Sequence, residues 1–146
     1  MELPIDAEML IPHRKPMRLI NRLNASDGKS GSASARFAAD CPFVIDHKGT
    51  IERLALLELI AQTYAASKGY EDLADGIDPS QGYLVGISKA VFRGDAHAGQ
   101  DLLIRIRTEE TFDNFYLAAG DVWHHDTLLV KATLKIWINS ENTREA

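Results

Sequence analysis

Residues 50–69 have the sequence TIERLALLELIAQTYAASKG, in which apolar residues occupy every face of a helix. Thr50 is a suitable N-cap, Glu52 is favourable in the first turn, and Gly69 follows Lys68 where a helix would end. A helix that is apolar on all sides is normally buried within a protein. The sequence therefore predicts one long buried helix, from Thr50 to Lys68.

Segments on both sides of this helix alternate between apolar and polar residues. Upstream, residues 18–23 and 32–37 flank a turn-forming stretch at residues 26–31, which predicts a hairpin. Downstream, period-2 alternation predicts four strands, at residues 83–92, 102–111, 115–123 and 128–138. The acidic stretch at residues 70–81 is predicted to be a surface loop. Such strands are typical of an antiparallel sheet with one face on the core. We predict an α+β hot-dog fold, in which a sheet of five to six strands wraps around the buried helix.

Composition limits the class of protein. The chain has 45% hydrophobic and 25% charged residues, as expected for a single globular domain over residues 1–146. A net charge of -5 argues against nucleic-acid binding. The N-terminus does not resemble a signal peptide, and no apolar run approaches the roughly 18 residues of a membrane span. With one cysteine, Cys41, and no metal-site spacing among the histidines, we expect a cytoplasmic protein without a metal or cofactor.

Glu58 is the first candidate for chemistry. It lies on one helix stripe with Leu54, Ala61 and Gln62. A buried carboxylate is costly unless it is paired, protonated or used in proton transfer. The stripe leaves two interpretations open: a structural carboxylate bonded to a neighbour such as Gln62, or a general acid or base.

Other candidates lie in predicted loops and strands. His47 stands just ahead of the helix and is the first candidate partner of Glu58, while His13 in the loop before the first strand is the reserve candidate. Gly86 lies inside a predicted strand, where glycine indicates either a bulge or a backbone that approaches a ligand tunnel.

Three segments, in order, resemble the (3R)-hydroxyacyl-[acyl carrier protein] dehydratases. Residues 10–23, LIPHRKPMRLINRL, resemble the opening LLPHRxPFLLVDRV of that family. Residues 57–62, LELIAQ, resemble its helix motif xEAMAQ, and residues 86–93, GISKAVFR, resemble its strand motif GIDKARFKR. The sequence AGQD at residues 98–101 stands where the family has PGD. The resemblance covers most of the chain.

The resemblance implies a site shared between two subunits, in which the helix carboxylate, here Glu58, works with a histidine from the loop before the helix. The family motif GHFPxxPxxPG is absent from residues 41–49, and Val44 stands at the histidine position. His47 is then the candidate substitute. Arg53 stands at the position of the glycine that helps form the family's oxyanion site, and Gln62 and Gly86 would also line the substrate site.

By resemblance, the chain would dehydrate a 3-hydroxyacyl thioester on acyl carrier protein, in fatty acid or polyene biosynthesis. Two alternatives stay open: a hot-dog acyl-thioesterase, and a non-catalytic partner that stabilises an active hot-dog dehydratase. Similar divergent members of the superfamily pair with a more typical dehydratase, so the expected assembly is a homodimer, a higher oligomer or a heterodimer with another hot-dog protein. Acyl carrier proteins are acidic, so Lys89 and Arg93 are candidate carrier contacts.

Overall fold

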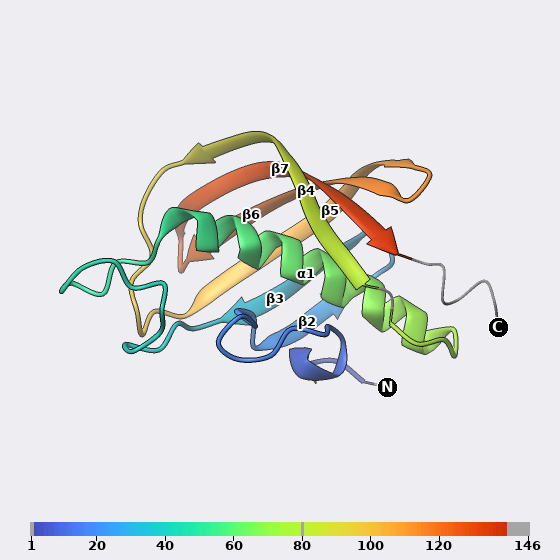
Figure 1. Cartoon of the computed structure of the whole chain (residues 1–146), viewed down its shortest axis with the longest axis horizontal. Coiled ribbons are helices and arrows are strands. Elements are labelled where there is room, and N and C mark those ends of the chain that lie inside the picture. Colours follow the sequence, from blue (N-terminus) through green and yellow to red (C-terminus); the bar gives the residue numbers. More distant parts are fainter. Residues whose placement is uncertain (1, 80, 140–146) are drawn as a thin grey trace.

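A computed structural model of the protein describes residues 2–79 and 81–139. One long helix packs in the curve of an antiparallel sheet, as the predicted hot-dog fold requires (Figure 1). The elements of the described chain are β1 (Ile5–Asp6), the 3-10 helix η1 (Ala7–Met9), β2 (Arg22–Ser26), β3 (Ser30–Ala35), α1 (Arg53–Ala74), β4 (Gln81–Phe92), β5 (Leu102–Phe112), β6 (Phe115–His124) and β7 (Thr127–Asn139). The strands form one sheet in the order β1-β2-β3-β5-β6-β7-β4.

The sheet has seven strands in the described chain, not the five or six that the sequence predicts. The additional strand is β1, a two-residue segment that pairs with β2 through Ile5–Leu23 and Asp6–Arg22. It is too short to show alternation in the sequence. The four strands predicted after the helix are all present, each with ends within two residues of the prediction.

The hairpin before the helix is displaced from its prediction. β2 begins at Arg22, whereas the alternation indicated a strand over residues 18–23. The reason is that the backbone amides of Leu19 and Ile20 donate to a helix side chain, Gln62, instead of to a neighbouring strand. Residues 10–20 therefore form an irregular segment that packs against α1, with Leu10 and Ile20 buried.

The helix begins later than predicted. Its N-cap is Glu52, whose carboxylate accepts a hydrogen bond from the Leu54 amide. Thr50 cannot cap the helix because it lies in a β-bridge with His97, and the next two residues also donate their amides to other segments. Tertiary pairing of this backbone thus overrides the local capping preference.

The helix also ends later than predicted, at Ala74 instead of Lys68. Gly69 lies inside α1, where a Cβ atom would overlap the carbonyl of Leu10. The glycine thus permits close approach of the N-terminal segment and does not stop the helix. The predicted loop at residues 70–81 is correspondingly shorter, since its first five residues are helical and Gln81 begins β4.

Most of α1 is buried, as predicted, but its first two turns have an open side. Leu54 is 63% exposed, and Glu58, one turn later, is partly exposed. This open side is an exception to the prediction of a helix buried on all faces. No helix in the described part of the chain is long and apolar enough to cross a membrane.

β4 is a long edge strand. It pairs with β7 on one side, and no other described strand pairs with its second side. Four of its large apolar side chains are exposed: Tyr83, Val85, Ile87 and Val91. A long edge with exposed apolar groups is a template for pairing with another chain.

Candidate active site

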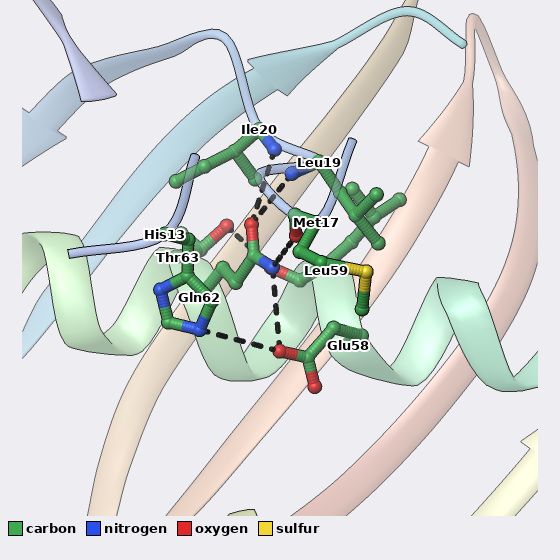
Figure 2. Close-up of polar contacts among 8 residues, drawn as sticks. All are labelled: His13, Met17, Leu19, Ile20, Glu58, Leu59, Gln62 and Thr63. Atoms are coloured by element: carbon green, nitrogen blue, oxygen red, sulfur yellow. Dashed lines mark hydrogen bonds and ion pairs between the residues drawn. The ribbon is translucent and has the colours of Figure 1, made fainter. Parts of the chain in front are cut away.

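The structure brings Glu58 and His13 together. Glu58 projects from the second turn of α1, and His13 comes from the N-terminal segment that crosses the helix (Figure 2). His13 Nε2 lies 3.8 Å from Glu58 Oε1, and the two side chains are 26% and 34% exposed. This separation is longer than a hydrogen bond, so a proton could pass between the carboxylate and the imidazole through one intervening water or after a small movement.

Gln62 joins this pair from one turn further along the helix. Its Nε2 donates to Glu58 Oε1 at 3.3 Å and to the Met17 carbonyl at 2.8 Å. Its Oε1 accepts from the amides of Leu19 at 2.8 Å and Ile20 at 3.4 Å. Gln62 therefore has both amide protons and its carbonyl oxygen engaged within the chain, and the substrate-binding role that the resemblance implies stays a prediction.

A narrow cleft lies beside these residues. Its lining comes from the N-terminal segment, α1, β4 and β7, namely His13, Glu58, Ala61, Gln62, Ala65, Gly82, Leu84 and Ile136. Its volume of about 10 Å³ is close to that needed for a single water molecule. This chain alone therefore does not enclose space for an acyl chain, but two of the lining residues belong to the edge strand β4.

His47 lies apart from this cleft in the described chain. It is exposed in the loop before the helix, and the contact with Glu58 is made by His13. The loop is shaped by Asp46, whose carboxylate accepts from the amides of Lys48 and Thr50. These hydrogen bonds, led by those to Thr50, hold the pKa of Asp46 below its ordinary value.

Arg53 and Gly86, two further candidates, are also outside the cleft lining. Arg53 is exposed, donates to Asp95 Oδ1 at 3.1 Å, and lies over the Phe92 ring. Gly86 stands at a bulge, where the register between β4 and β7 shifts, and a Cβ atom there would make only ordinary contact with Lys135. The glycine that lines the cleft is Gly82, which the sequence did not single out.

Lys89 and Arg93 lie on the opposite face of the sheet from the helix. They line a hollow of about 650 Å³ together with three other basic residues, Arg105, Arg107 and Lys131. Two of the three are paired, Arg105 with Asp121 and Arg107 with Glu109. The structure thus gives the predicted carrier contacts basic neighbours that the sequence pattern did not identify. Carrier binding itself stays a prediction.

The residues that the sequence missed at the cleft lie far apart along the chain. Gly82, Leu84 and Ile136 reach Glu58 only because β4 and β7 pair and pack on α1. Within the described residues, no group of three His, Cys, Asp or Glu side chains could hold a metal ion.

These features define a hot-dog protein with an ionisable pair formed between its central helix and its N-terminal segment. The chain belongs to the ApeP-like family, described as ApeP dehydratase, which its sequence matches over residues 5–145. No curated relative matches the sequence.

Solved structures share this fold at low sequence identity. The dehydratase heterocomplex ApeI:P from Xenorhabdus doucetiae contains a chain with a TM-score of 0.84 and 19% identity, covering 97% of this chain and 95% of that chain. An uncharacterized protein from Pyrococcus horikoshii has a TM-score of 0.70 and 8% identity, covering 96% and 97% of the two chains. A hypothetical thioesterase from Streptococcus pneumoniae, solved with coenzyme A, has a TM-score of 0.61 and 10% identity, with coverages of 80% and 86%. At these identities the likeness establishes the fold.

Proposed function

We propose that the chain is a subunit of a dehydratase that removes water from a 3-hydroxyacyl thioester carried on acyl carrier protein, in polyene or fatty acid biosynthesis. The observation that carries the proposal is the Glu58–His13 pair beside a cleft on the central helix. Membership of the ApeP-like dehydratase family supports the same reaction class.

In the proposed reaction, neutral His13 accepts the proton from C2 of the substrate through Nε2. Protonated Glu58 gives its proton to the hydroxyl on C3, the C3–O bond breaks, and water leaves as the C2–C3 double bond forms. The enzyme has then gained one proton on His13 and lost one from Glu58. Transfer between the two partly exposed side chains through a water molecule restores the starting state, so no co-reactant is needed.

The substrate channel would require a second subunit. The cleft of about 10 Å³ is far below the roughly 300–1,000 Å³ of ligand sites. Beside it lie the unpaired edge of β4 and the exposed Leu54. We propose that a second hot-dog chain pairs with β4 and provides the missing wall. The heterocomplex formed by the relative from Xenorhabdus doucetiae favours a heterodimer, and a homodimer is the competing assembly.

A second candidate function is that of a stabilising partner without its own turnover. The absence of the family histidine motif from residues 41–49 favours it, because the active histidine and carboxylate could then both be supplied by the partner's site. The two functions differ in whether Glu58 of this chain is needed for turnover.

Glu58→Gln tests the proposal. The purified chain, alone and with a co-expressed hot-dog dehydratase, would be assayed on 3-hydroxyacyl-[acyl carrier protein] for enoyl product and for free thiol. Loss of general acid–base catalysis should slow enoyl formation about 10²–10⁴-fold while the assembly stays intact. Glu71→Gln is the matched control, because Glu71 is on the same helix about 20 Å away along its axis and pairs with Lys68.

Three outcomes separate the candidates. A selective loss with Glu58→Gln supports the dehydratase. Full turnover by a complex that contains Glu58→Gln refutes it and supports the stabilising partner. Release of free thiol without enoyl product identifies a thioesterase instead.

A further inference from the structure

The buried amide of Gln62 links the two halves of the candidate site. Gln62 is 1% exposed, and its side chain holds the N-terminal segment on α1 through Met17, Leu19 and Ile20. The same amide holds Glu58 Oε1. Figure 2 shows these bonds converging on Gln62 from both sides.

The backbone determines which way this amide points. The amides of Leu19 and Ile20 can only donate hydrogen bonds, so they require the Gln62 oxygen. The Met17 carbonyl can only accept, so it requires the Gln62 nitrogen. A flipped amide would place donor against donor and acceptor against acceptor. The second amide proton of Gln62 is therefore directed at Glu58.

This direction makes the two oxygens of Glu58 unequal. Oε1 accepts from Gln62 and lies nearest to His13, whereas Oε2 accepts no hydrogen bond from the described residues. In Figure 2 the second oxygen points away from both neighbours. Oε2 is consequently the oxygen that is free to meet a substrate hydroxyl.

His13 is connected to the same amide through the chain. The amides of Met17 and Arg18 both donate to the Arg14 carbonyl, which closes a turn directly after His13. Gln62 holds that turn on the helix by its bond to Met17. If the amide is removed, both the position of His13 and the rotation of the Glu58 carboxylate lose their support.

We infer that Gln62 is a positioning residue that aligns His13 with Glu58 and presents Glu58 Oε2 to the substrate. The inference rests on the proposed function for its catalytic consequence, but the alignment itself is a property of the folded chain. Displacement of a reacting group by about 1 Å can lower a rate about 10²-fold. A loss of this size is expected in kcat. KM should change little, because the Gln62 amide already has all its hydrogen-bonding groups engaged and offers none to a substrate.

Gln62→Glu tests the two hydrogen bonds that the Gln62 nitrogen donates. The carboxylate keeps the shape of the side chain and still accepts from Leu19 and Ile20, but while ionised it cannot donate to Glu58 or to the Met17 carbonyl. In the proposed complex with a second hot-dog chain, kcat should fall about 10–100-fold near neutral pH. It should recover as the pH is lowered, because the new carboxyl group then regains a proton to donate. Thr63→Ala is the control, because Thr63 is buried beside Gln62 but donates only to the Leu59 carbonyl of its own helix. An unchanged kcat and pH profile in Gln62→Glu overturns the inference.

A second measurement does not depend on turnover. In ¹⁵N-histidine-labelled protein, Glu58→Gln should shift the ring resonances of His13. In a Gln62→Met background, which removes the amide without adding charge, that shift should shrink or vanish, as a coupling between the two positions requires. An equal shift in both backgrounds overturns the inference.

The two experiments separate the claims. Coupling that depends on Gln62 in a protein without dehydratase activity would sustain the positioning role and refute the proposed function. Dehydratase activity, with a His13 shift that is the same whether or not the Gln62 amide is present, would support the proposed function and refute the positioning role. If Gln62→Met does not fold, which circular dichroism would show, Gln62→Glu with and without Glu58→Gln provides the same comparison.

Discussion

Gly69→Ala should destabilise the protein, although alanine is the better helix former. Gly69 lies inside α1, where replacement by alanine in an unobstructed helix would stabilise folding by about 1 kcal/mol. Here the new Cβ atom would overlap the Leu10 carbonyl, a backbone group that cannot rotate away as a side chain can. Forcing extra atoms into a packed interior costs about 1–3 kcal/mol, and a backbone neighbour places the cost in the upper part of that range. The expected net loss is about 1–2 kcal/mol, or roughly 2–8 °C in melting temperature for a chain of this length.

Denaturant unfolding at one fixed protein concentration would measure this loss, since assembly changes apparent stability. Ala74→Gly, at the exposed end of the same helix, provides the control for helix propensity without a clash. Hydrogen exchange locates the effect: the Leu10 and Ile11 amides, which both donate to the Ala7 carbonyl, should exchange faster in Gly69→Ala. A variant as stable as the wild type, or more stable, would refute the close-approach argument.

Three further predictions concern ionisation, assembly and carrier binding. Burial raises the pKa of Tyr64 to about 12 from an ordinary 10.0. The stability that the protonated phenol gives the folded state is therefore present below pH 10 and is lost between pH 10 and about 12. Tyr64→Phe should make the free energy of unfolding less sensitive to pH in this range. Val85→Lys on the β4 edge should prevent association with a second hot-dog chain in size-exclusion chromatography, whereas Leu103→Lys, an exposed apolar position on β5 in the middle of the sheet, should not. Lys89→Glu with Arg93→Glu should weaken binding to an acidic acyl carrier protein at low salt. Equal affinity in that variant and in Arg22→Glu with Arg36→Glu, a matched charge change, would contradict a carrier role for the hollow.

Local periodicity was sufficient to predict the long helix and the four strands that follow it. Apolar residues around the helix at residues 50–69 and alternation in the later strands depend only on neighbours a few positions away. The ends of the helix could not be read in the same way. Thr50 has the chemistry of an N-cap, but its backbone is bonded to other segments, and Gly69 has the chemistry of a helix stop, but it serves contact with Leu10.

The candidate site was predicted only in part. Glu58 stood out because a carboxylate on an apolar stripe is unusual, and Gln62 stood out through a motif. The substrate contact expected of Gln62 stays a prediction, and the structure adds four hydrogen bonds that its amide makes with the N-terminal segment and Glu58. No sequence pattern indicates that Gln62 bonds to residues that lie 42 to 45 positions before it.

The sequence by itself determined the helix, the alternating strands and the presence of a carboxylate on an apolar stripe of the helix, because each is a local consequence of side-chain size and polarity. Only the tertiary structure decided which histidine meets Glu58 in this chain. His47 is nearer in sequence, but its loop turns outward around Asp46, whereas Gln62 holds the segment after His13 on the helix. The physical reason is that packing and hydrogen bonding bring together residues that are far apart in the sequence. Separation along the sequence does not reveal which residues will meet.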